Sequence, residues 1–200
     1  MIIFIFSKSS WNVYNFRKNL IKKLISDKHD IFVIAKKDKN EKKLQNLGCK
    51  FIDINFENDS FNILKDLMAL IKIFLLIKNF KPDLFLNFNI KPVILGSIIC
   101  NFMNIKVVNT ITGLGNAFLG RLFLKKIATY LYKLAISDNN KVIFHNHEDK
   151  KIFIKEGISK KFNSFVVLGS GVDTNYFKFS KLSKKKQFFF LWGDFYGTRV

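Results

Sequence analysis

The sequence is short of residues that would cross-link it or carry it across a membrane. Its two cysteines, Cys49 and Cys100, lie far apart in apolar surroundings, which excludes a disulfide framework and favours a reducing compartment. No charged leader precedes the apolar run that starts at Ile2, so no signal peptide is expected. The longest apolar stretch, residues 61–77, is broken by charged residues and is not expected to span a bilayer.

Several catalytic and cofactor motifs are also missing. Gly113 and Gly115 form a GxG, but the third glycine of the dinucleotide fingerprint and the acidic residue that follows it are absent, which excludes a nicotinamide cofactor. There is no P-loop, no CxxC and no Ser-His-Asp pattern. His145 and His147 lack a surrounding set of ligands, so we expect no metal and interpret them as part of a turn that caps the next helix.

Acidic residues are scarce: 15 Asp and Glu stand against 34 Lys and Arg, a net charge of +19. One interpretation is codon bias, because Lys, Asn, Ile and Phe are all over-used, as an AT-rich genome would give. The other is attraction to an anionic partner, either a membrane surface or a phosphate-bearing substrate. The lysines are spread over most predicted helices and no binding motif for DNA or RNA is present, so no nucleic acid is expected as a partner.

What the sequence does contain is a regular alternation of strand-like and helical patterns. Seven such alternations predict an α/β fold with a doubly wound, parallel, Rossmann-like sheet, and an apolar share of 48% is ample for its core. The predicted helix at residues 61–78 either packs on the sheet alone or also touches a lipid surface. The predicted strands are residues 2–6, 31–35, 51–54, 84–88, 106–110, 141–144 and 165–168.

The central unit is residues 84–116, which reads as strand, short helix, strand and glycine loop. Two parallel strands joined by a helix bring their carboxyl-end loops to one edge of the sheet, where ligands bind in open α/β folds. Asn87, in a buried strand, needs hydrogen-bond partners and is expected to face a ligand cleft. The glycine loop is either a tight turn or a place where backbone amides approach a phosphate or a sugar hydroxyl. The predicted edge comprises Asn87, Lys91, Thr112, Gly113, Gly115 and Asn116.

The loop after the first strand offers further candidates. Ser10 and Asn12 lie where the next helix begins, and Asn12 is the predicted cap; alternatively, the loop contacts an anion or a sugar through free N–H groups of the first turn. One turn further on, Arg17 is either solvated or a phosphate clamp. The apolar stripe of this helix is predicted as Val13, Phe16, Leu20, Ile21, Leu24 and Ile25.

Five segments, in this order, carry a resemblance to a known family. They are Trp11 to Arg17, Asn89 to Pro92 with Gly96, Asn109 to Gly115, Asn146 to Gly157, and Gly169 to Asp173. Together they resemble the family 4 glycosyltransferases of bacterial capsule, O-antigen and glycan assembly. The resemblance implies one half of a GT-B fold, namely an amino-terminal domain over residues 1–177. In this family that domain holds the acceptor, usually a polyprenyl-diphosphate-linked sugar.

The resemblance also implies the activity and its setting. It implies retaining sugar transfer from a nucleotide-sugar to a lipid-linked glycan, without a cofactor or a required metal, by a cytoplasmic protein at the inner face of the bacterial plasma membrane. It adds Asn15 to the substrate-binding candidates. Family members commonly carry a histidine where this chain has Asn87, the one catalytic candidate that it offers. The expected donor-side loop comprises Gly169, Ser170, Gly171 and Asp173.

The end of the chain departs from the family pattern. Residues 178–200 are predicted as a linker and the start of a donor-binding domain, but Trp192 to Val200 matches the family only after a shift of reading frame. We expect that a frameshift truncates a longer enzyme, which would be inactive alone. The alternatives are one chain of a split enzyme, or a non-enzymatic basic module that binds membrane surfaces or nucleic acid.

Overall fold

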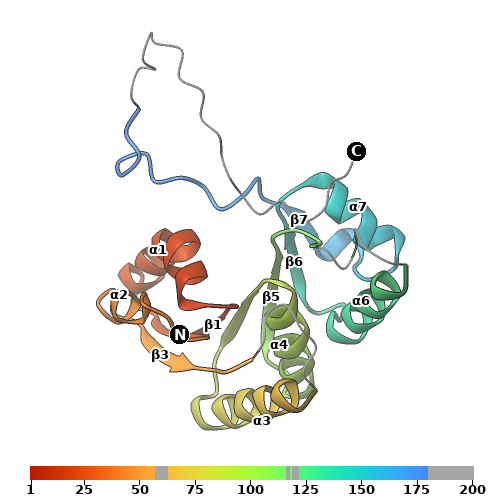
Figure 1. Cartoon of the computed structure of the whole chain (residues 1–200), viewed down its shortest axis with the longest axis horizontal. Helices are drawn as coiled ribbons and strands as arrows, with labels where there is room; N and C mark the ends of the chain where they lie inside the picture. Colours follow the sequence, from red (N-terminus) through yellow and green to blue (C-terminus); the bar gives the residue numbers. More distant parts are fainter. Residues whose placement is uncertain (57–62, 116–117, 119–121, 180–200) are drawn as a thin grey trace.

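The computed structural model describes residues 1–56, 63–115, 118 and 122–179, and these form one seven-stranded parallel sheet flanked by helices (Figure 1). The strand order is β3-β2-β1-β4-β5-β6-β7. The predicted doubly wound parallel sheet is confirmed, and the strand ends shift by no more than two residues. The strands are β1 (Ile2–Phe6), β2 (Asp30–Ala35), β3 (Lys50–Asp53), β4 (Leu84–Phe88), β5 (Lys106–Ile111), β6 (Lys141–Phe144) and β7 (Ser164–Val166).

The helices cover both faces of the sheet. Helices α1 and α2 pack on one face at β1 and β2, whereas α3, α4, α6 and α7 cover the other face. The alternation of side chains along β1 explains this division: Ile3 and Ile5 face α1, and Phe4 and Phe6 face α3. The helices are α1 (Ser10–Ser26), α2 (Glu41–Gln45), α3 (Ile63–Phe80), α4 (Ile90–Phe102), α6 (Leu122–Ala135) and α7 (His147–Lys155), with a 3-10 turn, η1 (Lys161–Asn163).

The order of the strands reverses at β1, which lies between β2 and β4. The chain builds outward through β2 and β3 on one side and through β4 to β7 on the other. The register pairs Phe6 with Asn87 and Phe88 with Thr110, so β1, β4 and β5 end at the same edge. In open α/β sheets, ligands bind at such a reversal, outside the carboxyl ends of the strands.

Helix α1 differs from its predicted form in its cap and its buried stripe. Ser9 is the N-cap, and its side chain accepts a hydrogen bond from the Asn12 N–H, so the prediction of Asn12 as the cap is wrong. Phe16 and Leu20 are 44% and 38% exposed, which contradicts the predicted stripe. The buried face instead runs through positions 13, 17 and 21, four residues apart, and therefore includes Arg17.

Two other local predictions, on the start of α7 and on the two cysteines, are confirmed. Asn146 caps α7, where its side chain accepts from the Asp149 N–H at 2.7 Å. Cys49 and Cys100 are both buried and free. Residues 180–200, which hold most of the predicted linker and the predicted start of a donor-binding domain, lie outside the described residues, so the division at residue 177 stays a prediction.

Candidate functional site

Asn89 ties three loops together at the carboxyl edge of the sheet. Its Oδ1 accepts from the Ser7 hydroxyl at 2.9 Å and from the Lys8 N–H at 3.4 Å, both in the loop after β1. Its Nδ2 donates to Thr112 Oγ1 at 3.4 Å, in the loop after β5. The backbone of Asn89 has a φ of +75° and a ψ of 164°, a strained combination that is found almost only at glycine. Asn89 thus holds the loops after β1, β4 and β5 in a fixed arrangement.

The first turn of α1 is already satisfied by protein groups. The Ser10 N–H donates to Lys36 O at 3.0 Å, and the Trp11 N–H donates to Asp38 Oδ2 at 2.7 Å. Ser10 is itself buried, and its hydroxyl accepts from the Asp38 N–H at 3.1 Å. This turn therefore has no free N–H group of the kind that an anion would need, and Ser10 joins α1 to the loop after β2.

Asn12 and Asn15 lie on different sides of α1. Asn12 is buried, and its Oδ1 lies 3.0 Å from the Ser7 hydroxyl oxygen, so it shares the single Ser7 proton with Asn89 and belongs to the same network. Asn15 is exposed, and its Nδ2 donates to Trp11 O of its own helix at 2.9 Å. The structure brings Asn12 to the edge of the sheet and does not bring Asn15 there.

Arg17 is the most unusual charged group at this edge. It is only 9% exposed, its guanidinium lies 4.2 Å from the centre of the Phe88 ring, and its Nε has no hydrogen-bond partner among the described residues. Burial lowers its pKa to about 10, which still leaves it positively charged at neutral pH. A buried cation with an unpaired N–H is costly unless an anion compensates it. Arg17 is therefore placed to receive an anionic group at the ends of the strands.

His145, directly after β6, lies within the electric field of Arg17. Burial lowers the pKa of His145, the positive charge of Arg17 lowers it further, and the carboxylate of Asp149 in α7 opposes both. The side chain is therefore neutral at pH 7. The edge thus combines one permanent buried cation with a neutral imidazole, which can donate or accept a hydrogen bond.

The lowered pKa of His145 predicts that the protein loses stability as the pH falls below about 6.5, the ordinary value for histidine. The unfolded chain takes up this proton at a higher pH than the folded protein does, so acidification through that window favours unfolding. The expected slope is at most about 1.4 kcal/mol per pH unit. Urea unfolding from pH 7.5 downward should show a shallower slope for His145→Gln. The exposed His147→Gln is the control, and an unchanged slope in His145→Gln would contradict the prediction.

Asn87 does not face a cleft, which corrects the expectation from the sequence. It is fully buried, and its Nδ2 donates to Asn109 Oδ1 at 2.9 Å, which also accepts from the Ser97 hydroxyl at 2.9 Å. Its Oδ1 has no partner, and a Cβ added at Gly96 of α4 would lie only 2.3 Å from it. Asn87 thus points under α4, on the opposite face of β4 from Phe88 and Arg17. Nothing at this position identifies a catalytic group.

The remaining edge candidates surround this arrangement. Lys91, in the first turn of α4, pairs with both carboxylate oxygens of Asp66 in α3 at 2.9 and 3.0 Å. Gly113 and Gly115 have φ values of +152° and +61°, which L side chains rarely adopt. No described residue lies within 4 Å of a Cβ added at Gly113, so this glycine is required by backbone conformation and not by close packing against the described part of the chain. Asn116 lies outside the described residues.

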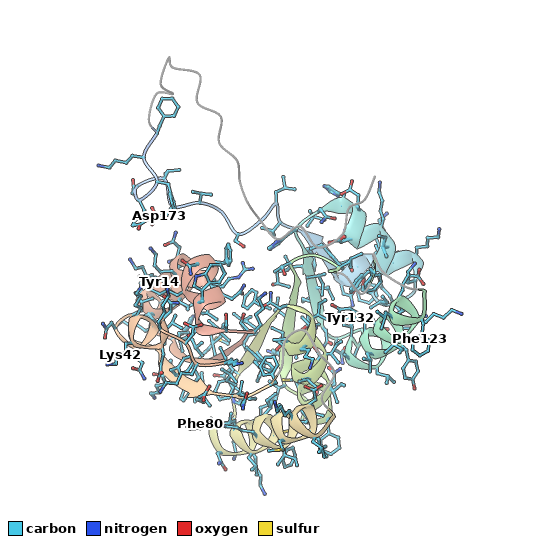
Figure 2. All side chains as sticks on the ribbon, in the orientation of Figure 1. Tyr14, Lys42, Phe80, Phe123, Tyr132 and Asp173 are labelled. Carbon is cyan, nitrogen blue, oxygen red and sulfur yellow. The ribbon has the colours of Figure 1, made fainter. Side chains whose placement is uncertain are left out.

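The loop that follows β7 crosses to the side of α1 (Figure 2). Gly169 and Gly171 take left-handed conformations, and Ser170 lies between them in exposed chain. Asp173 closes a turn, with its Oδ1 accepting from the Tyr176 N–H at 3.2 Å. The Lys18 ammonium of α1 lies 5.3 Å from the centre of the Tyr176 ring, so the expected donor-side loop ends beside α1.

Three site residues escaped the sequence reasoning: Ser7, Asn89 and His145. Arg17 was among the predicted candidates, and it shares a helix face with Val13 and Ile21, each four residues away. Asn89 offered a weaker signal, as an asparagine between a buried strand and a helix. In the part of the chain that the structure describes, no group of three or more His, Cys, Asp or Glu residues is placed to hold a metal ion.

Comparison with solved structures identifies the fold. A glycosyltransferase from Rickettsia africae aligns with 88% of this chain and 45% of its own, with a TM-score of 0.64 and 17% identity. Anabaena HepE in complex with UDP and glucose aligns with 90% of this chain and 47% of its own, with a TM-score of 0.63 and 19% identity. A UDP-GlcNAc 2-epimerase from Methanocaldococcus jannaschii gives a TM-score of 0.59 at 15% identity over 84% of this chain and 45% of its own. These likenesses establish a Rossmann-like GT-B half.

Comparison of sequences identifies the family. The N,N'-diacetylbacillosaminyl-diphospho-undecaprenol alpha-1,3-N-acetylgalactosaminyltransferase of Campylobacter jejuni is 28% identical over 194 residues. That alignment covers 92% of this chain and 50% of the relative, so the chain spans about half the relative's length. The model of the glycosyl transferase 4-like family matches residues 2–146, well over half of the chain. This protein therefore belongs to the glycosyl transferase 4-like family and corresponds to the amino-terminal domain of a family 4 glycosyltransferase.

Proposed function

We propose that this chain forms the acceptor-binding half of a glycosyltransferase, which transfers a sugar from a nucleotide-sugar to a polyprenyl-diphosphate-linked glycan. The observation that carries the proposal is Arg17, a buried guanidinium with an unpaired Nε at the carboxyl edge of the sheet. The name of the Campylobacter relative describes a diphospho-undecaprenol acceptor, which presents two phosphates to its enzyme. A diphosphate supplies the anion that Arg17 lacks.

Each group at the edge has a role in holding such an acceptor. The guanidinium of Arg17 donates to a phosphate oxygen, a charge-assisted hydrogen bond that would be strong in this desolvated place. The stack on Phe88 fixes the plane of the guanidinium. Asn89 holds the loops after β1 and β5 on either side, and no described residue crowds the loop at Gly113, where the sugar would lie. His145 adds a neutral hydrogen-bonding group beside the phosphate position.

The reaction also requires a donor site, a stereochemical course and access to the lipid. The donor nucleotide binds to a separate donor-binding half, so the acceptor half turns over no sugar by itself. Transfer retains the anomeric configuration of the donor and needs no divalent cation. The protein works in the cytoplasm at the inner face of the plasma membrane, because a polyprenyl diphosphate stays in the bilayer.

Calorimetry tests whether this chain binds the acceptor and not the donor nucleotide-sugar. The expected result is saturable binding of a short-chain polyprenyl diphosphate that carries one N-acetylhexosamine, and no binding of UDP-N-acetylglucosamine. The same lipid without its diphosphate is the matched control and should bind more weakly by at least about tenfold, the value of one charge-assisted hydrogen bond. Tight binding of the UDP-sugar with none of the lipid would overturn the proposal.

A further inference from the structure

A diphosphate acceptor would bring more negative charge to the edge of the sheet than Arg17 can balance. A diphosphate that joins a lipid to a sugar carries a negative charge on each of its two phosphates, and neither phosphate is protonated near neutral pH. Arg17 offers a single positive charge in a buried place. An uncompensated charge is costly where water is excluded. A second positive group within reach of Arg17 would therefore strengthen binding.

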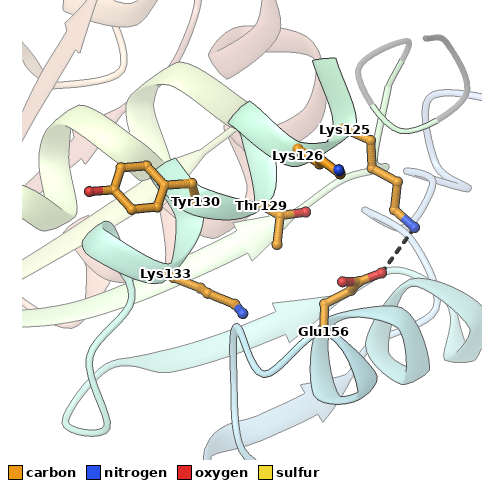
Figure 3. Close-up of a pocket in the computed structure, with 6 residues that line it drawn as sticks. All are labelled: Lys125, Lys126, Thr129, Tyr130, Lys133 and Glu156. Carbon is orange, nitrogen blue, oxygen red and sulfur yellow. Dashed lines mark ion pairs between the residues drawn. The ribbon is translucent and has the colours of Figure 1, made fainter. Parts of the chain in front are cut away.

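The lysines at the edge and on the neighbouring helices are placed for other contacts. Lys8, in the loop after β1, and Lys91, which pairs with Asp66 of α3, both interact with other groups of the chain. The lysines of α6 line a cavity of about 360 Å³ beside α7, together with Glu156 (Figure 3). Helices α6 and α7 pack on the face of the sheet opposite to Arg17 and Phe88, and none of the described helices is both long and apolar enough to cross a membrane. The lysines of this cavity therefore do not face a ligand held by Arg17.

His145 is the titratable group that the fold places near Arg17. The sheet pairs Phe88 with Thr110 and Thr110 with Ile143, which puts these residues of β4, β5 and β6 on one level and on one face. Arg17 lies on that face, 4.2 Å from the centre of the Phe88 ring. His145 follows Ile143 by two residues at the carboxyl end of β6, where it is partly buried and within the field of Arg17. A ligand on Arg17 would therefore lie close to the imidazole.

Two charged side chains from different helices act on His145 in the free protein. The guanidinium of Arg17 in α1 favours the neutral imidazole, as burial does, whereas the carboxylate of Asp149 in α7 favours the imidazolium. Asp149 is buried and accepts a hydrogen bond at 3.0 Å from the asparagine that caps α7, so its position is fixed. His147 and Glu148, in the first turn of α7, are exposed. A diphosphate on Arg17 would reverse this balance, because its two negative charges exceed the single positive charge of the guanidinium.

We propose that His145 takes up a proton when the acceptor diphosphate binds, so that the guanidinium of Arg17 and the imidazolium of His145 together balance its two charges. The proton comes from the solvent and joins a ring nitrogen, and no bond of the lipid changes. The inference rests on the proposed function, since the ligand is the same lipid-linked diphosphate. Binding becomes stronger as the pH falls from about 8 to about 6, although the free protein loses stability over the same range.

Calorimetry in buffers of different ionisation enthalpy measures this proton directly. The probe is the short-chain polyprenyl diphosphate that carries one N-acetylhexosamine, whose phosphates do not titrate near neutral pH. At pH 7 the full chain should take up about half a proton or more per lipid bound, and His145→Gln should take up almost none. His147→Gln, an exposed residue next to the site, is the matched control and should take up as much as wild type does. Asp149→Asn, which removes the carboxylate that favours the imidazolium, should take up less than wild type.

The affinity of His145→Gln separates this role from a merely structural one. It should equal that of wild type at pH 8 and be about fivefold to tenfold lower at pH 6, because only wild type gains a charge in this interval. A lysine would attract the diphosphate equally at both values, since the ordinary pKa of lysine is about 10.4. A damaged fold would weaken binding at both values. Circular dichroism at each pH confirms that the variants are folded.

Three results would overturn the inference, and they differ in what they say of the proposed function. Equal proton uptake in wild type and His145→Gln would assign the proton to another group. Lipid binding by wild type without proton uptake would leave the acceptor function standing and remove the role of His145. Absence of any lipid binding would overturn the inference and the proposed function together.

Discussion

With Arg17 replaced by methionine, the protein is expected to bind a polyprenyl-diphosphate acceptor about 10- to 100-fold more weakly, while its free energy of unfolding stays close to that of wild type or rises. A charge-assisted hydrogen bond contributes about 1.5–3 kcal/mol, which sets the expected loss. Stability should not fall in parallel, because Arg17 is desolvated and its Nε has no partner in the described part of the folded protein. Replacing a buried charge by an apolar side chain is often neutral or stabilising.

The contact between Arg17 and Phe88 determines how much stability the substitution removes. Loss of this cation–π contact costs about 0.5–2 kcal/mol, and methionine recovers part of it by packing on the ring. Urea unfolding should therefore place Arg17→Met within about 1 kcal/mol of wild type or above it. Lys22→Met, an exposed residue of the same helix, removes the same charge and should change neither quantity. A loss of several kcal/mol in Arg17→Met would show that the guanidinium serves the fold instead.

His145 provides an independent measure of the field that Arg17 exerts. The charge of Arg17 is one cause of the lowered pKa of His145, so its removal should raise that pKa toward the ordinary value. Proton NMR of the imidazole across the acid range reads this shift without any ligand. A charge that acts on His145 and on an acceptor diphosphate alike would link the pH dependence of the free protein to its binding of phosphate.

Much of the fold could be predicted because the strands at its centre are buried on both faces. Apolar runs such as Phe4 to Phe6 and Phe85 to Leu86 need only their hydrophobicity to be recognised. The site was less predictable, because its residues are defined by the face of the strand or helix on which each side chain lies. The strand-end position of Asn87 suggested a cleft, but the two-residue period of β4 places it under α4 and turns Phe88 toward Arg17.

Arg17 shows the same limitation in a helix. Phe16 is the more apolar neighbour and was assigned to the core, yet the face of α1 that meets the sheet runs through Val13 and Ile21. Which stripe is buried depends on the angle at which the helix packs on β1 and β4, and that angle is a tertiary property. Hydrophobicity alone does not place an arginine in the interior. The fold imposes that burial and leaves a positive charge that an anionic ligand would compensate.

The buried contact between Gly96 and Asn87 should make Gly96→Ala strongly destabilising. Alanine normally stabilises a helix by about 1 kcal/mol relative to glycine. Here the added methyl would lie 2.3 Å from Asn87 Oδ1 and 2.9 Å from its Cγ, so it must displace an amide that is hydrogen-bonded to Asn109. Overpacking costs about 1–3 kcal/mol and a disturbed buried hydrogen bond about 1 kcal/mol more. Urea unfolding should show a total loss of about 2–4 kcal/mol, the reverse of the usual sign.

The second substitution Asn87→Ala identifies the cause of that loss. It removes the atoms that collide with the new methyl, so Gly96→Ala should cost at least about 1.5 kcal/mol less in the Asn87→Ala background than in wild type, because residues in direct contact are coupled. Gly113→Ala is the matched control, since no described residue lies within 4 Å of its added Cβ and its φ of +152° makes backbone conformation the expected source of its cost. That cost should add to the cost of Asn87→Ala without coupling. If the losses in free energy of unfolding for Gly96→Ala and Asn87→Ala were instead additive, the cost of Gly96→Ala would come from the α4 backbone. The collision with Asn87 would then not explain why residue 96 is glycine.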